Sequence, residues 1–304
     1  MDVSIIIVNY NTLLTTAACI DRIVEATIGV KFEIIIFDNA STDGSREHFS
    51  ADRRVSYIYH HENIGFGRAN NQALERARGR NILFLNPDTL LVNDAVSILC
   101  NYLDRNADVA VVGGDLFDER MRPALSFRRL RPSIWWELSL LLWQLPQRLC
   151  FPRSWYFNRT IRPIDVGYIT GADLMARRAD LLAAKGFAPE FFMYYEDTDL
   201  CHRLNKTGRI VALPDAHIQH LEGGSFDTHG INPRRILLTE QGRHIYYQRN
   251  HSPRHHSIAN RIYMLTLRLH GAIHRLLRHH TRAADYALRL KIVKDLQRSI
   301  QSAR

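Results

Sequence analysis

The chain has 304 residues, of which 46% are hydrophobic and 23% are charged. This length and composition fit one large α/β domain with an appendage and exclude a chain that is disordered throughout. The net charge of +9 is uneven, because residues 233–304 hold fifteen Lys and Arg against three Asp and Glu, a local balance of +12 that leaves −3 for the remainder. This basic segment indicates contact with anionic lipid, nucleic acid or another acidic partner, or a solvated tail that has no partner.

The N-terminus predicts a strand rather than a targeting segment. Residues 3–8 are a continuous apolar run, and no basic region, apolar stretch of signal-peptide length or cleavage site precedes or overlaps them. The cysteines are far apart and lack metal-ligand spacing, so we expect reduced, mostly buried thiols of a cytosolic protein, with one disulfide pair as the alternative. These cysteines are Cys19, Cys100, Cys150 and Cys201.

Strands and helices alternate over the first 90 residues. Apolar runs predict strands at residues 3–8, 32–37, 55–60 and 81–85, and helical spacing predicts helices at 15–27 and 67–78. A turn at residues 39–44 is typical of the start of a further helix. This alternation predicts a doubly wound α/β sheet.

Polar residues follow three of the predicted strands. They are Asn9-Tyr10-Asn11, Asp38-Asn39 and Asn86-Pro87-Asp88. Ligands of open α/β sheets bind at the carboxyl ends of the strands. Three such ends that all carry Asn or Asp therefore indicate a polar ligand of nucleotide size.

Two later segments are apolar without being long enough to cross a bilayer. The first, residues 134–143, is rich in tryptophan, is interrupted by Glu137 and ends before Pro146; it predicts either an interfacial segment or a core helix. The second, residues 258–280, has an apolar stripe with arginines on the other side. It predicts a basic amphipathic helix that binds a membrane surface or packs on its own protein. The stripe comprises Ile258, Ile262, Leu265, Leu269, Ile273 and Leu276, and the arginines are Arg261, Arg268, Arg275 and Arg278.

Several motifs occur in an order that resembles a known family. They are Val8-Asn9-Tyr10-Asn11, residues 38–44, Asn63-Ile64-Gly65 with Asn70-Asn71, Asn86-Pro87-Asp88, residues 191–201, Leu213-Pro214-Asp215 and His220. Each is weak alone, but the ordered set, which covers residues 3–226, resembles family 2 inverting glycosyltransferases of the GT-A fold and, among them, the bacterial rhamnosyltransferase branch. The resemblance implies a nucleotide-sugar donor and a divalent metal ion, Mg²⁺ or Mn²⁺.

The resemblance also implies a nucleotide-sugar site. Asp38 would accept hydrogen bonds from the base or ribose, or else cap the following turn. Gly65 would let the backbone approach the phosphates at a helix N-terminus. Family members often carry Arg in the place of Asn70, and Arg68 is the candidate to replace that charge. The full predicted set is Val8, Asn9, Tyr10, Asp38, Asn39, Gly65, Arg68, Asn70, Asn86, Pro87, Asp88, Gly171 and Asp173, the last for sugar hydroxyls.

Asn86-Pro87-Asp88 stands in the place of the family's metal-binding DXD motif. The first Asp of that motif is replaced by Asn86, as is familiar in the rhamnosyltransferase branch, so Asp88 is the one anionic metal ligand expected. His220 matches a position where relatives supply a histidine near the metal, although a lone histidine is more often structural.

Inverting transfer needs a base that takes the proton of the acceptor hydroxyl. By resemblance Asp197 is that base and Glu196 the second candidate, while Asp199 caps or braces a helix at residues 200–205. The preceding aromatic residues either raise the proton affinity of the base or belong to the core.

The sequence thus predicts a GT-A domain at residues 1–226, with nucleotide binding mainly in 1–115 and acceptor binding and catalysis in 116–226, followed by a basic helical tail at 227–304. The predicted reaction transfers L-rhamnose from dTDP-L-rhamnose to a hydroxyl of a lipid-linked glycan precursor for cell-surface polysaccharide. UDP-galactofuranose and UDP-hexoses are the alternative donors. The tail would hold the enzyme at the cytoplasmic face of the membrane, as a peripheral protein on anionic lipid.

Two other classes of protein remain as alternatives. A sugar nucleotidylyltransferase would need a glycine-rich, basic loop after the first strand, which residues 8–12 do not provide. A non-catalytic nucleic-acid-binding protein would use the basic tail, but no recognised nucleic-acid motif accompanies that charge.

Overall fold

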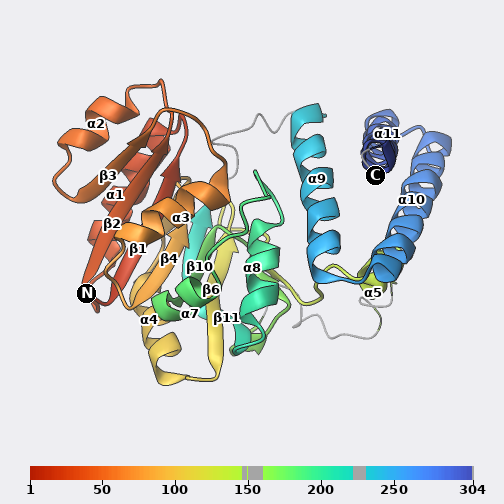
Figure 1. Ribbon diagram of the computed structural model, residues 1–304. Coiled ribbons are helices and arrows are strands. Elements are labelled where there is room, and N and C mark those ends of the chain that lie inside the picture. Colours follow the sequence, from red (N-terminus) through yellow and green to blue (C-terminus); the bar gives the residue numbers. More distant parts are fainter. Residues whose placement is uncertain (146–148, 150–159, 222–230, 303–304) are drawn as a thin grey trace. The chain divides into compact units, whose positions relative to one another are not determined.

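The computed structural model describes the whole chain except residues 146–148, 150–159, 222–230 and 303–304 (Figure 1). The chain forms two compact units. The sheet unit comprises Met1–Arg129, Arg153–Phe192 and Glu196–Ser225, and the helical unit comprises Leu130–Pro152, Met193–Tyr195 and Phe226–Arg304. The boundary predicted at residues 226 and 227 lies outside the described residues. The helical unit also takes in the tryptophan-rich segment, which was predicted to belong to the first domain.

The sheet unit is built on one mixed sheet with the strand order β3-β2-β1-β4-β10-β6-β11-β5, and β8 pairs with β11. The neighbours β3, β2, β1 and β4 run parallel, whereas β10 is antiparallel to both β4 and β6. The strands are β1 (Val3–Asn9), β2 (Phe32–Asn39), β3 (Val55–His60), β4 (Asn81–Leu85), β5 (Thr89–Leu91), β6 (Val109–Phe117), β8 (Ile164–Asp165), β10 (Asp173–Arg177) and β11 (Arg209–His220). The predicted α/β fold class is confirmed.

Helices cover both faces of this sheet (Figure 1). On β1, Ile5 and Ile7 pack into one core with α1 and α4, while Ile6 and Val8 pack into the other with α3 and α8. Both faces are buried, which explains why the strand is apolar at every position instead of alternating. The helices of this unit are α1 (Leu13–Ala26), α2 (Ser45–Ala51), α3 (Phe66–Arg76), α4 (Ala95–Arg105), α7 (Arg178–Ala183) and α8 (Glu196–Leu204).

Two features in the second half of this unit differ from the prediction. The first is a short two-stranded sheet outside the main sheet, which the apolar runs did not predict: β9 (Tyr168–Ile169) pairs with β7 (Phe127–Arg128). The helix expected at 200–205 begins earlier, at Glu196. Helical spacing alone does not locate that start, because four polar residues open the helix.

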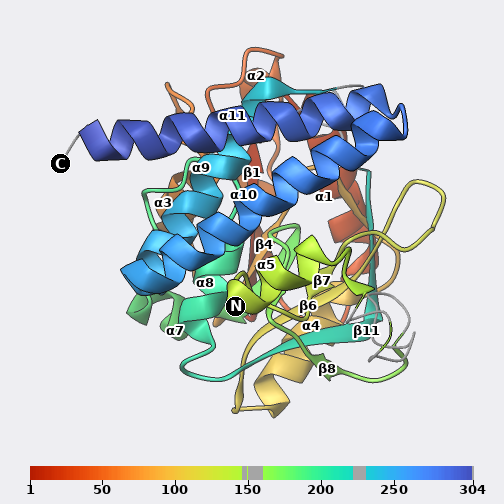
Figure 2. The same cartoon turned by 90° about the vertical axis from the view of Figure 1, so that its right-hand side faces the viewer.

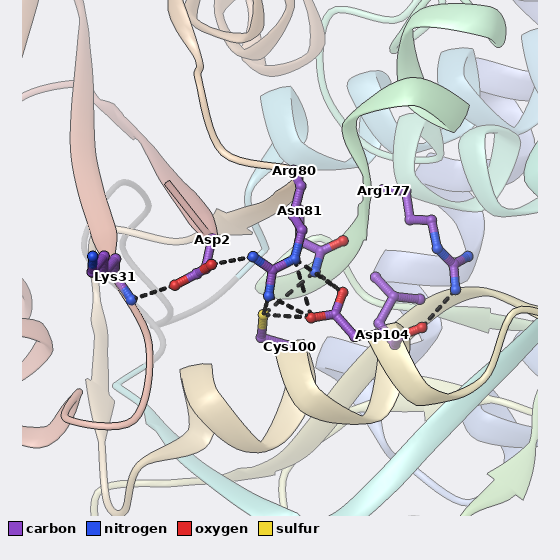
Figure 3. A network of polar contacts seen from close by, with 8 residues as sticks. Asp2, Lys31, Arg80, Asn81, Cys100, Asp104 and Arg177 are labelled. Carbon is purple, nitrogen blue, oxygen red and sulfur yellow. Dashed lines mark hydrogen bonds and ion pairs between the residues drawn. The ribbon is translucent and has the colours of Figure 1, made fainter.

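A polar network fixes the strand ends opposite the predicted ligand site (Figure 3). The Arg80 guanidinium, just before β4, donates to Asp2 before β1 and to Asp104 on α4. Asn81 donates to the other oxygen of Asp104 at 2.8 Å. The network ties two strands and one helix together near their ends. Cys100 lies in it, and burial raises the pKa of its thiol.

The cysteines of the described residues are free and buried, as predicted. Cys19 lies in the core between α1 and the sheet, where burial raises the pKa of its thiol to about 12. Cys100 and Cys201 are likewise free thiols. Cys150 lies outside the described residues.

Four helices make up the described part of the helical unit. They are α5 (Ile134–Leu141), α9 (Pro233–Asn250), α10 (Pro253–Leu276) and α11 (His280–Ser302). Helix α10 packs against the other three and lies side by side with α11 (Figure 2). The starts of α9 and α10 follow from local sequence, because each has Pro at its first position after a capping side chain, Asn232 and Ser252 respectively.

A buried ion pair holds α5 in this unit. Glu137 accepts hydrogen bonds from the Arg243 guanidinium at 2.8 Å and from the Tyr247 hydroxyl at 2.8 Å, and Arg243 also donates to Asn260. Both charged side chains are almost fully buried. Glu137, the charge that interrupts the apolar segment, therefore fixes α5 to α9 from inside the unit. Trp135 of the same helix remains 75% exposed.

Helix α10 exposes its apolar stripe instead of burying it. Leu265 and Leu269 are 51% and 42% exposed, whereas the side that packs inward carries Thr266, Leu267 and His270. The stripe was predicted either to bind a membrane or to pack on the protein itself; in this structure most of it faces outward. No helix among the described residues is both long and apolar enough to cross a membrane.

Replacement of Glu137 by alanine should destabilise the helical unit by about 3–5 kcal/mol, because Arg243 would keep a buried charge without its partner. Urea unfolding of the full chain, followed by circular dichroism, measures the change. Glu25→Ala is the matched control, since it removes a surface ion pair with Arg22 and should cost at most about 1 kcal/mol. Equal stability of the two variants would show that the buried pair does not anchor α5.

Candidate active site

The ends of β1 and β2 are tied by buried side chains. Register pairs Asn9 with Asp38, and the Asn9 amide donates to the Asp38 carboxylate at 3.0 Å and to the Ser41 hydroxyl at 2.9 Å. The Asp38 carboxylate also accepts from the Ser41 amide at 2.7 Å and from the Tyr57 hydroxyl at 2.8 Å. Asp38 is fully buried. Both carboxylate oxygens of Asp38 therefore accept hydrogen bonds from within the protein. Asp38 orders the loop below the predicted nucleotide site.

This cluster continues into the first helix. The hydroxyls of Thr12 and Thr16 donate to the Asn9 side-chain oxygen at 2.7 and 3.0 Å. Neither threonine was predicted from the sequence, nor was Tyr57. A signal existed for the threonines: they lie four residues apart at the start of an amphipathic helix, so both meet the strand that precedes it.

The loop after β2 is fixed to neighbouring segments. The Asn39 side chain donates to Asn63 at 2.9 Å and accepts from the Ile64 amide at 2.9 Å. The side chain of Tyr10, the residue after β1, is exposed, whereas Val8 within β1 is buried. Of the residues predicted at this end, Tyr10 therefore has the most accessible side chain, and Asn9 and Asn39 hold the framework.

Gly65 is required by a close backbone approach. Its φ is +86°, and a Cβ there would lie 2.5 Å from the Phe192 carbonyl oxygen, which accepts from the Phe66 amide. Arg68 is exposed and donates to the Pro189 carbonyl at 2.8 Å. Asn70 is buried and donates to the Phe66 carbonyl, so its side chain faces the inside of the unit. Among the predicted residues, Arg68 is then the available cation here.

The turn after β4 lies next to the end of β11. His220 Nε2 is 3.2 Å from an Asp88 carboxylate oxygen and 3.3 Å from the Asn86 amide nitrogen. Pairing of β11 with β5 sets this contact, since His220 pairs with Thr89. Residues 134 positions apart thus meet, and Asn86, Pro87, Asp88 and His220 are all partly accessible.

The Asp88 and His220 pair can serve a divalent cation. One carboxylate oxygen and one imidazole nitrogen are suitable ligands for Mn²⁺ and, for the oxygen, Mg²⁺. The described residues contain no group of three or more His, Cys, Asp or Glu side chains arranged to hold a metal by themselves. The donor set therefore fits a cation that takes most of its ligands from a bound diphosphate or water.

The segment 171–173 joins this turn to the candidate base. The Asn86 amide donates to the Ala172 carbonyl at 3.0 Å, and the Gly171 amide donates to Asp197 Oδ2 at 2.9 Å. Asp173 follows at the start of β10. It is fully buried, and its carboxylate accepts a hydrogen bond from the Gly114 amide. Burial raises the pKa of Asp173 to about 7. Asp173 therefore supports the segment from inside.

Asp197 and Glu196 differ in surroundings. Asp197 is partly accessible, and its carboxylate accepts from the amides of Gly171 and Thr198. Burial raises its pKa, and these hydrogen bonds oppose the rise. Glu196 is buried, and the oxygen Oε2 has no hydrogen-bond partner among the described residues. Burial, followed by the nearby Asp197 charge, raises the pKa of Glu196 to about 8. Of the two carboxyl groups, Glu196 therefore holds its proton more readily, and Asp197 is the better candidate for the charged form.

The third acidic residue of this motif braces its helix. Asp199 is fully buried and accepts from Arg203 at 2.8 Å, one turn later on α8. The two residues before the motif, Tyr194 and Tyr195, have φ of +72° and +71°. Such conformations are uncommon for residues with a Cβ and recur next to functional groups.

Solved structures share this architecture. The mannosyltransferase PcManGT of Pyrobaculum calidifontis, crystallised with GDP-Man and Mn²⁺, superposes with a TM-score of 0.60 at 16% identity, over 96% of this chain and 85% of that one. This likeness shows the fold, a GT-A glycosyltransferase architecture. The chain belongs to glycosyl transferase family 2, whose family model matches residues 4–161.

Curated relatives include rhamnosyltransferases. The N-acetylglucosaminyl-diphospho-decaprenol L-rhamnosyltransferase of Mycobacterium tuberculosis is 26% identical over 204 residues, which are 62% of this chain and 66% of that protein. Rhamnosyltransferase WbbL of Escherichia coli is 26% identical over 164 residues, 51% of this chain and 60% of that protein. The chain thus spans less than two thirds of the length of these relatives.

Proposed function

We propose that this protein is an inverting glycosyltransferase that moves a sugar from a nucleotide-activated donor to a glycan hydroxyl. The observation that carries the proposal is the link through residues 171–173, which brings the accessible carboxylate of Asp197 close to the Asn86, Asp88 and His220 turn. A base next to a diphosphate site is what direct displacement at an anomeric carbon requires.

The residues divide the reaction between them. The acceptor hydroxyl oxygen attacks the anomeric carbon from the face opposite the diphosphate, and its proton passes to an Asp197 carboxylate oxygen. The bond from the anomeric carbon to the diphosphate oxygen breaks, and the nucleoside diphosphate leaves with the electron pair. Asp197 fits the base because it is partly accessible and held in place, whereas Glu196 is buried with a pKa raised to about 8, which favours its neutral form.

We assign the diphosphate end of the donor to the turn after β4. Asp88 and His220 would hold Mg²⁺ or Mn²⁺, which when bound neutralises charge on the leaving diphosphate. The related mannosyltransferase crystallised with GDP-Man and Mn²⁺ supports this use of the fold. Tyr10 and the loop fixed by Asn9, Asp38 and Asn39 would receive the nucleoside.

We further propose dTDP-L-rhamnose as the donor and a lipid-linked glycan precursor as the acceptor. The names of the two curated relatives support this choice, since both are rhamnosyltransferases and one acts on a diphospho-decaprenol. Asn86 in place of the first metal-site Asp agrees with that branch. UDP-galactofuranose and UDP-hexoses remain alternative donors.

The outward face of α10 suits a membrane surface. Four leucine and isoleucine side chains of its stripe are exposed, and arginines at positions 254, 261, 268 and 275 are also exposed at seven-residue intervals on one flank. An apolar stripe flanked by arginines inserts at the headgroup boundary of anionic lipid. We propose peripheral attachment of the protein through this face, at the cytoplasmic side, where nucleotide-sugar donors are available.

Asp197→Asn should reduce turnover by about 10²–10⁴-fold, because the amide does not take the acceptor proton. Donor binding should persist, since Asp197 lies outside the predicted nucleotide contacts. Release of nucleoside diphosphate from a panel of dTDP- and UDP-sugars, with thermal shift for binding, measures both. Near-wild-type transfer by this variant would exclude Asp197 as the base.

Glu196→Gln is the matched control and should keep turnover within about tenfold of wild type, because the raised pKa of Glu196 favours a neutral side chain, which Gln mimics. In wild type, turnover should fall as pH drops through the raised pKa of Asp197, which must be ionised to act. The same acidic limb should appear in Glu196→Gln. Burial that raises the pKa of Glu196 also costs stability as pH rises from about 4.5 to 8, so this variant should gain Tm over wild type at pH 8 more than at pH 5.

Asp88→Ala should raise the Mn²⁺ concentration needed for half-maximal turnover by about tenfold or more, because it removes the one anionic ligand of the proposed metal site. A titration of Mn²⁺ against an EDTA blank, with the donor that turns over, gives that concentration. Asp21→Ala, which removes an exposed carboxylate on α1, should match wild type. An unchanged metal dependence in Asp88→Ala would remove Asp88 from the ligand set.

Leu265→Gln combined with Leu269→Gln should weaken binding to vesicles of anionic phospholipid by about tenfold or more for each leucine, since burying a leucine contributes about 1.5–3 kcal/mol. Co-sedimentation of the full chain measures the bound fraction. Leu182→Gln, an exposed leucine of the sheet unit, is the control and should bind like wild type. Full binding by the double variant would show that another surface holds the membrane.

A further inference from the structure

A groove of about 870 Å³ lies within the helical unit and has no role in the reaction described above. Its volume falls in the range of small-molecule sites, which is about 300–1,000 Å³. Helices α5, α9, α10 and α11 all contribute to its walls. The lining residues that matter here are Trp143, Arg235, His270, Arg282, Tyr286 and Arg289.

Trp143 forms a fixed aromatic wall of this groove. Its ring stacks on His270 with centroids 3.8 Å apart and an angle of 14° between the planes, and the residue is still 41% exposed. His270 is held by a hydrogen bond from Nε2 to the Leu141 carbonyl at 3.1 Å. Trp143 and the next residue, Gln144, have φ of +52° and +58°. A ring packed on one side, on strained backbone, offers its free surface to a ligand.

The groove carries surplus positive charge. Arg289 is neutralised by Asp285 at 2.8 Å and by the buried Glu240 at 3.2 Å. Arg235 and Arg282 are exposed, and neither forms an ion pair with any residue that the structure describes. The carboxylate in the lining, Asp285, is paired with Arg289, so two guanidinium groups on different helices line the groove without an ion pair of their own. Guanidinium groups bind phosphate oxygens with paired hydrogen bonds.

The remaining walls suit a sugar. Hydroxyl and amide side chains, among them Thr239 and Asn232, line the groove together with the Trp143 ring. An aromatic face packs on the C–H face of a pyranose while polar side chains bond its hydroxyls. A phosphate next to that ring would meet the two arginines.

The source of such a ligand follows from α10. One face of this helix supplies Thr266, His270 and other walls of the groove, and a neighbouring face carries the exposed Leu265 and Leu269. If the outer side rests on lipid, the groove opens within the same helical unit that touches the membrane. A phosphorylated saccharide that reaches it then comes from a lipid anchor.

We propose that the groove binds the phosphate-bearing saccharide of a lipid-linked acceptor, with the sugar on Trp143 and the phosphate on Arg235 and Arg282. This inference rests on the proposed glycosyl transfer. It adds an acceptor site on the helical unit, distinct from the donor site on the sheet unit.

The test uses the full chain and N-acetylglucosamine 1-phosphate as a soluble probe, with tryptophan fluorescence and calorimetry. The probe should bind more tightly than inorganic phosphate or N-acetylglucosamine alone. Trp143→Ala, and Arg235→Ala combined with Arg282→Ala, should each weaken binding by about tenfold or more. Lys291→Ala with Lys294→Ala, two exposed cations of α11 outside the groove, is the matched control and should bind like wild type. Wild-type affinity in both groove variants would overturn the proposal.

A second arm separates the lipid-linked source from a free sugar phosphate. With a polyprenyl-diphosphate saccharide in vesicles as acceptor, the groove variants should raise the acceptor KM about tenfold and leave the donor KM unchanged. An unchanged acceptor KM, despite lost binding of the soluble probe, would overturn the assignment to acceptor. Loss of dTDP or UDP binding in the groove variants would make the groove a nucleotide site and also overturn it. If no donor of the panel is used by wild type, the proposed transfer fails, while the probe still tests the groove.

Discussion

The hydrogen bonds of Asn9 hold together the edge of the sheet on which the candidate active site is built. Its side-chain amide nitrogen donates to Asp38 and Ser41, and its side-chain oxygen accepts hydrogen bonds from the hydroxyls of Thr12 and Thr16. All these groups are buried or nearly so, where an unmatched polar atom costs about 1–3 kcal/mol. The network is therefore a strict constraint on how β1 and β2 end. The accessible residues above it, such as Tyr10, depend on that framework for their positions.

A second constraint is electrostatic. Burial raises the pKa of two neighbouring carboxyl groups, Glu196 and Asp197, so ionising one disfavours ionising the other. The hydrogen bonds from the Gly171 and Thr198 amides favour the charged form of Asp197, because both are donated to its carboxylate. One short backbone segment thus selects the base candidate and, through Ala172, also holds the turn that carries Asp88.

The helical unit uses its polar residues in an unusual way. Glu137 and Arg243 are inside, histidine His270 packs inward, and leucines such as Leu265 and Leu269 are outside. This inverts the arrangement of an amphipathic helix in water, and an exposed apolar stripe is typical of an interaction surface. The groove with its two unmatched arginines, Arg235 and Arg282, lies among the inward-facing polar residues. Membrane contact and acceptor binding are thereby assigned to two different faces of α10.

The sequence by itself determined the α/β fold and the family, because unbroken apolar runs specify buried parallel strands and because ordered motifs survive as local patterns. It also placed Asp88 and His220 together as candidates through the resemblance. Only the tertiary structure decided that Asp38 and Asn70 turn inward, and that the stripe of α10 turns outward. Those outcomes depend on partners far away in the chain, such as Tyr57 for Asp38 and Glu137 for Arg243. Local spacing contains no information about which distant group will form a hydrogen bond with a buried polar atom.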